Sequence, residues 1–451
     1  MTSQTSSDSW DSHPCGWKPT SSGRYVREQD TREKLVLRQV RGVAGHINYH
    51  MVFSVRLRYS MACSDAESRV RAAWISLRCA QPSIAAVAED NLMTFSAICP
   101  EDVDAWVSNT FFVHETTDSA LSLSSEFQPV AKMQLHFLPR SKELILCASH
   151  EHADGHGMIM LLDTICENIA FPSLPVFEDQ AERLSPPLDI AARIGAASPR
   201  IWDQTAKLMK EWGMRAARPL HINADRQGPS VGNVSTSRLV FSDKDSSAIF
   251  RWAKARGLSV NDAMNGAVVM ATKQHGNMEG NWLGGVMMDA RNQIPAPYDV
   301  RKHAATIFFV ACPAFVENPQ SVVDAATQIQ KQRVAFQQDP EALQILQPML
   351  KMATASNSKI ESKIRTAASQ SQVEYSGLGS LSGFLEQAHG SIEIVDFWLT
   401  LGHCNNSVGV YCYTYRGKLN FSFSYNPGFH SERNVESFIR ILKTLVEELY
   451  A

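Results

Sequence analysis

The chain has no long apolar run, no closely spaced cysteine pair and no excess of positive charge. A helix that spans a membrane needs about 18 consecutive apolar residues, whereas the longest apolar stretches here, such as 144–148, have only the length of a strand. The nine cysteines include no Cys-x-x-Cys pair, which is typical of reduced intracellular thiols. The net charge of −3 offers no basic footprint for nucleic acid. We therefore expect a soluble, cytoplasmic protein that binds neither membranes nor nucleic acids.

Length and proline content predict how the chain is divided. The polar start lacks the basic and apolar segments of a secretion signal, and we expect a flexible tail over 1–24. A chain of 451 residues exceeds the roughly 250–300 residues of a single core. We therefore expect an N-terminal lobe over 25–185 and a C-terminal lobe over 236–451. Seven prolines fall between 172 and 229, and 186–235 is predicted to be a Pro-rich crossover between the lobes.

Apolar periodicity predicts strands and helices in both lobes. The first lobe should contain a strand over 47–59, a helix over 65–81, a β-hairpin over 130–149 and a helix over 157–170. In the second lobe we expect strands over 236–241, 283–288 and 306–316 and a hairpin over 409–425. The helices of this lobe are expected over 242–255, 259–275, 321–337, 340–353 and 432–448. This mixture indicates the α/β class.

The motif His-x-x-x-Asp occurs three times, at His114, His150 and His221. The spacing alone therefore identifies no site, and the context must decide. Only His150 directly follows an apolar strand, and only its partner Asp154 is followed by glycines and then by a helix. A strand, a tight loop and a helix can hold an imidazole rigidly at the edge of a buried cleft. His150 is therefore the candidate catalytic base.

An imidazole with a pKa of about 6.5 can remove a proton from an attacking alcohol or amine at neutral pH. Acyl transfer from an activated thioester needs nothing more, neither a metal nor a covalent intermediate. Gly155 can adopt a positive φ or let another backbone approach closely. Asp154, one turn from His150, can fix the loop by pairing inward. We interpret Cys147 as a small buried side chain rather than a nucleophile.

The same segment is open to a second interpretation as a metal site. His150, His152, Asp154 and His156 lie within seven residues, and imidazoles and carboxylates bind zinc. The segment is similar to the His-x-His-x-Asp-His motif of the metallo-β-lactamase superfamily, but Gly155 stands where that motif requires His. A metal-dependent hydrolase that uses these four residues is therefore an alternative hypothesis, whereas our main hypothesis includes no metal.

His150-x-x-x-Asp154-Gly155 after an apolar strand resembles the signature of the acyl-CoA-dependent acyltransferase superfamily. That group includes chloramphenicol acetyltransferase, plant BAHD acyltransferases and nonribosomal peptide condensation domains. Four further segments resemble its elements in the expected order: a strand and two helices over 239–275, Asp289-Ala290-Arg291 at a strand end, the small residues 376–379 near the cleft, and 396–398 as a degenerate BAHD Asp-Phe-Gly-Trp-Gly motif. The resemblance covers most of residues 40–451 and is strongest to fungal enzymes similar to trichothecene 15-O-acetyltransferases.

The resemblance implies two lobes like those of chloramphenicol acetyltransferase, each with a mixed β-sheet flanked by helices, and an active-site tunnel between them. Acyl-CoA would enter as co-substrate from one face, and a small hydroxylated secondary metabolite from the other, in a monomer without a bound cofactor. His150 would deprotonate the acceptor hydroxyl, which would attack the thioester directly. Asp154 would pair with Arg291 and brace the loop against the second lobe. Asp289 would orient Arg291 or cap the following turn.

Four more residues are candidates for substrate binding. His152 and His156 extend the motif, and each is interpreted either as a supporting or solvent-facing group or as a substrate ligand. Ser380, together with the backbone around Gly379, is a candidate for stabilising the oxyanion. Trp398, in the degenerate BAHD segment, is interpreted as either a core residue or a substrate contact.

Two departures from the superfamily patterns bear on the reaction. Ser149 stands where condensation domains usually carry His, which favours a free-standing transferase over peptide condensation. Trp398 and Leu399 replace residues of the BAHD motif, so the contribution of the intact motif is lost. A cyclase or pericyclase that uses the same fold without CoA, and a scaffold protein with a decayed site, therefore remain as alternatives.

Overall fold

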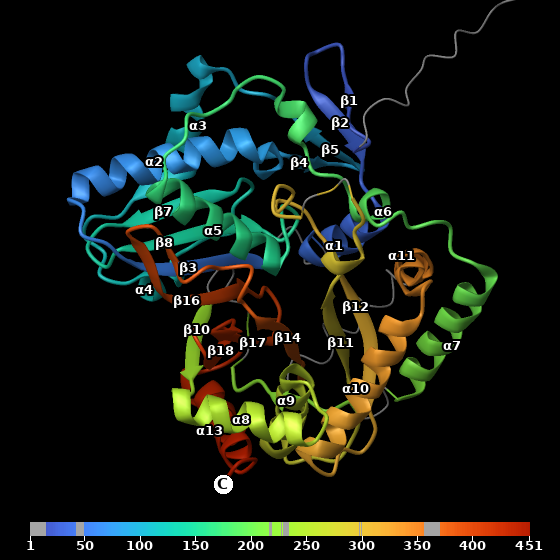
Figure 1. The fold of residues 1–451 in the computed structure, drawn as a ribbon. Coiled ribbons are helices and arrows are strands. Elements are labelled where there is room, and N and C mark those ends of the chain that lie inside the picture. Colours follow the sequence, from blue (N-terminus) through green and yellow to red (C-terminus); the bar gives the residue numbers. More distant parts are fainter. Residues whose placement is uncertain are drawn as a thin grey trace, which may run out of the picture.

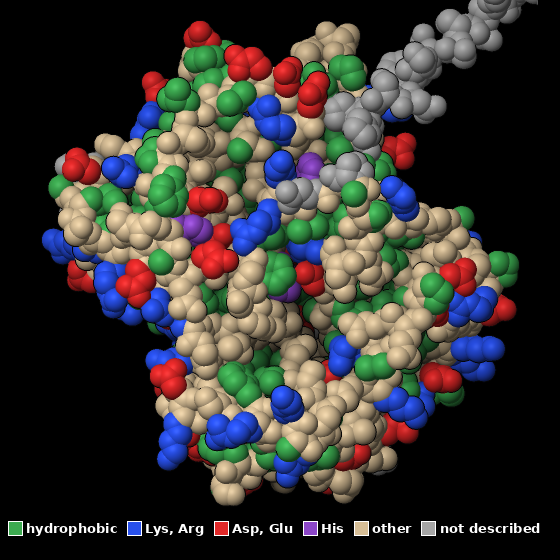
Figure 2. All heavy atoms as spheres, in the orientation of Figure 1, with side chains coloured by type: hydrophobic (Ala, Val, Ile, Leu, Met, Phe, Trp, Pro, Cys, Tyr) green, Lys and Arg blue, Asp and Glu red, His purple; other side chains and the backbone are tan. Residues whose placement is uncertain are grey.

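The computed structural model describes residues 15–41, 49–215, 219–226, 228, 234–296, 298, 300–355 and 370–451. These residues form two lobes, each built on β-strands with helices packed against them (Figure 1). In the space-filling view the surface is hollowed where the lobes meet (Figure 2). Helices and strands of both lobes confirm the predicted α/β class.

A six-stranded sheet is the centre of the N-terminal lobe, with the order β15-β16-β3-β8-β7-β6. All its pairs are antiparallel except β6 with β7. Helices α2 and α5 pack on one face through apolar side chains, and the short α4 packs on the other. The bounds are β3 His50–Arg58, α2 Cys63–Ala80, α3 Val103–Thr110, β6 Phe111–Val113, α4 Ala120–Ser124, β7 Gln134–Leu138, β8 Glu143–Ser149, α5 Gly155–Ala170, β15 Ala388–His389 and β16 Ile392–Gly402.

β16 belongs to the N-terminal sheet although it lies late in the chain. We predicted that 236–451 form the C-terminal lobe, and this is wrong for β15 and β16. β16 pairs with β3 from Glu393 opposite Arg58 to Gly402 opposite His50. Apolar side chains of β16 enter the cores on both faces of the sheet, although Glu393, Asp396 and Thr400 interrupt the apolar sequence. The chain therefore returns to the first lobe before it completes the second.

The C-terminal lobe contains a four-stranded sheet of order β10-β18-β17-β14 and a separate ribbon, β11-β12. β14 runs parallel to β17, and the other pairs are antiparallel. Helices α8, α9 and α13 pack on the sheet, and α10 packs on α9 and the ribbon. The bounds are β10 Ser235–Val240, α8 Asp243–Ala255, α9 Val260–Gly276, β11 Trp282–Asp289, β12 Phe309–Val316, α10 Val322–Gln338, β14 Val373–Ser380, β17 Val408–Tyr415, β18 Lys418–Tyr425 and α13 Glu432–Glu447.

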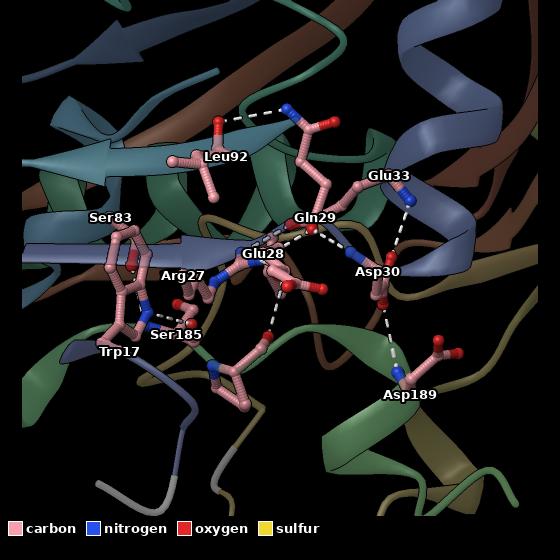
Figure 3. A network of polar contacts seen from close by, with 12 residues as sticks. Trp17, Arg27, Glu28, Gln29, Asp30, Glu33, Ser83, Leu92, Ser185 and Asp189 are labelled. Atoms are coloured by element: carbon pink, nitrogen blue, oxygen red, sulfur yellow. Dashed lines mark hydrogen bonds and ion pairs between the residues drawn. The ribbon is translucent and has the colours of Figure 1, made fainter. Parts of the chain in front are cut away.

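Part of the predicted flexible tail is folded. Residues 1–14 of that tail lie outside the described residues, but 15–24 belong to the first lobe. Trp17 is 1% exposed, and its Nε1 donates to the carbonyl of Ser185 over 3.1 Å (Figure 3). Burial of this large indole fixes a segment whose turn residues suggested flexibility. A small sheet of order β1-β2-β5-β4 and helix α1 follow, with bounds β1 Lys18–Pro19, β2 Tyr25–Glu28, α1 Thr31–Arg41, β4 Val87–Glu89 and β5 Leu92–Phe95.

The predicted crossover, 186–235, contains regular structure where it is described. Helix α7 packs beside α11 at the side of the second lobe (Figure 1), and the short β9 pairs with β13. Positions 216–218, 227 and 229–233 of this crossover lie outside the described residues. The bounds are α6 Leu188–Ala191, α7 Pro199–Arg215, β9 Ile222–Asn223, α11 Leu346–Ala355 and β13 Gln370–Ser371.

Candidate active site

A cavity of about 420 Å³ lies between the lobes. The N-terminal lobe contributes α1, β3, β16 and the segment after β8, and the C-terminal lobe contributes β11, β12 and β14. Five of the site residues that were selected from the sequence line this cavity: His150, Asp154, Gly155, His156 and Asp289.

His150 directly follows β8, whose buried residues fix the backbone from which the ring projects. Nδ1 is buried and forms no hydrogen bond within the described part of the chain, which leaves Nε2 as the nitrogen that a ligand can reach. The ring centroid lies 5.5 Å from that of Phe309. Burial lowers the pKa of His150, although its own carbonyl and the Asp154 carboxylate act in the opposite sense. The ring is therefore neutral at pH 7 and able to accept a proton.

Asp154 is saturated with hydrogen bonds. Its Oδ1 accepts from the Gly157 amide at 2.7 Å and from Arg291 Nη2 at 2.8 Å. Its Oδ2 accepts from the Phe308 amide at 2.7 Å and from Arg291 Nη1 at 3.0 Å. Burial would raise the pKa of this carboxyl, but the Arg291 charge and the hydrogen bonds outweigh burial and lower it. Asp154 is thus the N-cap of α5 and a charged brace to the second lobe, with no lone pair left for a substrate.

Asp289 and Arg291 complete this brace. Arg291 follows the end of β11, is buried with its side chain 4% exposed, and donates to Asp289 Oδ1 at 3.0 Å as well as to Asp154. Asp289 Oδ1 also accepts from the backbone amide of Arg291 at 3.1 Å. The geometry thus matches both expected uses of Asp289, orientation of the guanidinium and capping of the turn. Burial would lower the pKa of Arg291, but the two carboxylates outweigh it and raise the value.

Two glycines allow α5 to approach the second lobe. Gly155 is the first residue of α5 and not a left-handed turn residue, and a Cβ there would lie 2.9 Å from Leu378 Cδ2. At Gly157 a Cβ would lie 2.3 Å from the carbonyl oxygen of Ala304. A backbone oxygen cannot move aside as a side chain can. Gly157, which was not selected from the sequence as a site residue, is therefore the position where this helix requires glycine.

The two additional histidines face different parts of the protein. His156 lines the cavity, where its Nε2 lies 3.0 Å from the Leu378 carbonyl oxygen and its Nδ1 lies 3.7 Å from Asp289 Oδ2. His152 does not line it, and its ring is buried near Trp17. A turn closed by the His152 amide and the Ser149 carbonyl reverses the chain and sends the ring away from the cavity. Of the two interpretations of His152, the substrate ligand is therefore wrong and the supporting group fits its position.

Ser380 and Trp398 also lie outside the cavity. Ser380 is exposed at the end of β14, and its Oγ accepts from the Ser382 amide at 3.3 Å. Trp398 is 2% exposed and packs against Val52 on the outer face of the six-stranded sheet. Side chains alternate along β16, so its neighbour Leu399 faces the cavity and Trp398 faces away. Substrate binding by Ser380 is therefore wrong, and of the two interpretations of Trp398 the core residue fits and the substrate contact does not.

The residues of the alternative metal site do not converge. Asp154 is engaged by Arg291, while His152 and His156 lie in different cavities. Within the described ranges no group of three or more His, Cys, Asp or Glu side chains could hold a metal ion. The four neighbouring positions in the sequence therefore do not form one ligand set.

The remaining candidates of the motif search lie elsewhere. His114 Nε2 is 2.9 Å from His136 Nδ1, and His221 Nδ1 is 2.9 Å from the Pro219 carbonyl oxygen. Neither His114 nor His221 lines the cavity. Cys147 is fully buried on the outer face of the sheet, and burial raises the pKa of its thiol well above the usual value. A Cys–His nucleophilic pair is thus not formed.

Arg32, Glu374 and Tyr49 are among the polar cavity residues that sequence reasoning missed. Arg32 comes from α1, Glu374 from β14, and Tyr49, just before β3, donates its hydroxyl to the Glu374 carboxylate at 3.1 Å. The only local signal was Asp30-Thr31-Arg32-Glu33, a capping-box pattern that predicts a helix start but not what the helix faces.

Comparison with known proteins identifies the fold. No protein-family model matches the chain. Over 95% of its length the chain is 23% identical to the acetyltransferase pigO of Monascus ruber, of which it covers 97%. The structure of a trichothecene 15-O-acetyltransferase from Fusarium sporotrichioides matches 96% of this chain and 97% of its own, with a TM-score of 0.83 at 14% identity. The first condensation domain of the calcium-dependent antibiotic synthetase matches 96% and 98%, with a TM-score of 0.63 at 12% identity. The chain has the condensation-domain fold.

The condensation-domain fold, with two lobes like those of chloramphenicol acetyltransferase, is the fold that the His150 motif led us to expect, and this prediction is confirmed. The matches extend over both lobes and so include the cavity between them. None of the helices in the described ranges combines the length and the apolarity needed to cross a membrane.

Proposed function

We propose that this protein is an acyl-CoA-dependent O-acyltransferase that transfers an acetyl group to a hydroxyl of a secondary metabolite. The observation that carries the proposal is the position of His150, a buried and neutral imidazole at a cavity that both lobes line. Similarity along almost the whole chain to an acetyltransferase supports acetyl as the acyl group.

In the proposed reaction the acceptor hydroxyl donates a hydrogen bond to Nε2 of His150. Nε2 takes up the proton while the hydroxyl oxygen attacks the carbonyl carbon of the thioester. The tetrahedral intermediate then loses CoA by cleavage of the carbon–sulfur bond, and the imidazolium of His150 returns the proton to the thiolate. Acyl-CoA is a co-substrate in this scheme, and the activated thioester makes a bound cofactor or metal unnecessary.

Asp154 acts in this scheme as a positioning residue. Its carboxylate is occupied by Arg291 and by two backbone amides, so it does not exchange a proton with His150 or with a substrate. Its contribution is to fix the loop after His150 against the second lobe, which keeps Nε2 at one place in the cavity. Correct placement of a base is itself a large part of its catalytic effect.

The test is a screen of the purified protein with acetyl-CoA and longer acyl-CoA thioesters against a panel of hydroxylated secondary metabolites. We expect thiol release that depends on the acceptor, with one acylated product molecule for each thiol, detected by mass spectrometry. Isomerised product without thiol release would favour the cyclase alternative. Hydrolysis that depends on stoichiometric zinc, measured by elemental analysis, would favour the hydrolase. Either result would contradict acyl transfer.

Two further properties belong to the proposal. A small-molecule enzyme whose cavity is lined by one chain can act as a monomer, and we propose a cytoplasmic monomer. Light scattering after size-exclusion chromatography checks the oligomeric state, and fractionation of producing cells checks the compartment.

A further inference from the structure

Arg32 lies in the first turn of α1, and a polar network fixes that turn. The Glu33 amide donates to Asp30 Oδ1 at 2.7 Å, and the Asp30 amide donates to Glu33 Oε2 at 2.9 Å, which forms a capping box. Asp30 Oδ2 also accepts from the Asp189 amide at 3.1 Å (Figure 3). Arg27 donates to both carboxylate oxygens of Glu33. The backbone that carries Arg32 is therefore held in one place.

The guanidinium of Arg32 lines the cavity and lacks a polar partner. Arg32 is 4% exposed, and its Cζ lies 3.8 Å from the centre of the Phe309 ring. Within the described ranges it forms no hydrogen bond and no ion pair, and its Nε is buried without a partner. Burial lowers the pKa of Arg32 to about 10, so the side chain is still charged at neutral pH. A buried charge without a partner is costly, so a ligand that supplies the opposite charge would bind here.

The carboxylates that influence Arg32 are already engaged. Asp154 is paired with Arg291 through both of its oxygens. Asp30 accepts from backbone amides, and burial together with the neighbouring carboxylates raises its pKa to about 7, so that a large fraction of it is uncharged at neutral pH. Both carboxylates act on Arg32 only at a distance, and neither forms an ion pair with it. The charge of Arg32 is thus left for a ligand in the cavity.

Arg32 and His150 both lie beside the ring of Phe309. Phe309 contacts the guanidinium on one side, and its centroid lies 5.5 Å from that of His150. A ligand group bound to Arg32 would therefore leave the rest of the molecule within reach of Nε2 of His150.

We propose that Arg32 is the anion-binding residue of this cavity and that it binds a carboxylate, or a comparable planar anion, carried by one of the two substrates. The inference rests on the proposed acyl transfer in that it names a substrate class for the same site. A guanidinium offers two parallel N–H donors that match a carboxylate, and a charge-assisted pair of this kind is stronger than a neutral hydrogen bond. The anion belongs either to the acceptor or to the acyl group of the thioester.

The experiment measures binding by calorimetry in the His150→Ala background, in which no turnover consumes the ligands. One arm compares 3-(hydroxymethyl)benzoate with benzyl alcohol, which lacks the carboxylate. The other arm compares malonyl-CoA with acetyl-CoA. We expect the charged member of one pair to bind about 10- to 100-fold more tightly than the neutral member, and Arg32→Gln to abolish this preference. The arm in which the preference occurs identifies the substrate that carries the anion.

Three controls keep the result open to refutation. Lys34→Gln removes a positive charge from the same helix outside the cavity lining and should leave the preference unchanged. Arg32→Lys retains the charge without the two parallel N–H donors of the guanidinium and should reduce the preference. This variant also tests the inference if Arg32→Gln fails to fold. Near-ultraviolet circular dichroism reports folding of each variant.

Equal affinities within both pairs would overturn the inference, as would a preference that survives Arg32→Gln or Arg32→Lys unchanged. Because binding is measured without turnover, the result is independent of the proposed reaction. A protein that shows the Arg32-dependent preference but releases no thiol would retain the anion site and refute the acyl transfer. A protein that releases thiol without any such preference would support the acyl transfer and refute the anion site.

Discussion

His150 combines a buried ring with an open path to the cavity, and this combination sets the pH range of the proposed base. Burial disfavours the imidazolium, which lowers the pKa of the ring below its ordinary value of about 6.5. A general base acts in its deprotonated form, so activity is lost only when the pH falls through that lowered pKa. At pH 7 the neutral, competent form of His150 therefore predominates.

The first prediction concerns the pH profile of kcat/KM. We expect kcat/KM to be constant near neutrality and to decrease along an acid limb whose midpoint lies under pH 6.5, because the neutral ring is the active form. The profile is measured by thiol release with a buffer series of constant ionic strength. An acid limb above pH 7 would contradict the buried environment of His150.

The second prediction concerns the charged brace. Asp154→Asn leaves the buried guanidinium of Arg291 without its main counter-charge, and we expect a loss of about 3–5 kcal/mol in the free energy of unfolding. Asp289→Asn is the matched control, because Asp289 is more exposed and holds Arg291 through only one oxygen, and it should cost about 1 kcal/mol or less. Urea unfolding measures both. Equal losses in the two variants would refute a special role for Asp154.

At the scale of elements, α5 connects the base to the second lobe. Its N-cap is Asp154, and its first turn approaches the Ala304 carbonyl because Gly157 has no side chain. The position of this helix therefore depends on a backbone contact as well as on the ion pair.

The third prediction tests that contact. Gly157→Ala places a Cβ 2.3 Å from the Ala304 oxygen, so α5 must shift, and we expect a loss of about 1–3 kcal/mol in stability together with a lower kcat. Gly213→Ala on α7 meets no atom within 4 Å and should instead be neutral or stabilising by about 0.4–1 kcal/mol. Urea unfolding and thiol release distinguish the two. A Gly157→Ala variant as stable and as active as the wild type would show that the contact is unimportant.

Elements with a strong local pattern could be predicted from the sequence. The apolar positions of 157–170 and the alternation around the turn before His150 predicted α5 and the β7–β8 hairpin within a few residues. Residues 15–24 of the predicted tail were misjudged because the burial of Trp17 depends on Ser185, far along the chain. The place of β16 could not be predicted either, because its partner β3 lies more than 300 residues earlier. Pairing over such separations leaves no local signal.

At the scale of the whole molecule, the site exists only where the lobes meet. The base comes from the first lobe, while Asp289, Arg291 and the strand β14 come from the second. The motif predicted His150 because its strand, loop and glycines are contiguous in sequence. Arg32 was missed because its role depends on how α1 packs on Phe309. The two interpretations of Trp398 could not be separated from the sequence, because alternation along β16 decides which face it occupies.

The fourth prediction concerns acid stability of the whole fold. His50 and His136 are buried, and burial lowers the pKa to about 4 for His50 and, with two nearby histidines, to about 3 for His136. Between these values and about 6.5 only the unfolded chain binds the protons, so stability falls as the pH falls, by about 1.4 kcal/mol per pH unit for each side chain. Asp30 acts in the opposite sense, because its raised pKa lets the folded chain bind a proton in part of the same range.

A variant isolates this contribution. His136 lies against the rings of Phe112 and Phe127, so His136→Phe should be accommodated and should flatten the dependence of stability on pH between 6.5 and 4. Urea unfolding at several pH values measures the slope. A slope identical to that of the wild type would show that His136 is not held neutral by the fold.

The most direct test of the proposed base is the rate of thiol release by His150→Ala with acetyl-CoA and an accepted alcohol. Without the imidazole the acceptor proton has no recipient at the position of Nε2, and we expect kcat/KM to fall about 10²- to 10⁴-fold. Affinity for the thioester and the free energy of unfolding should change little, because the ring makes no hydrogen bond through its buried Nδ1 within the described residues. A folded His150→Ala variant that transfers acyl groups at the wild-type rate would contradict the role assigned to His150.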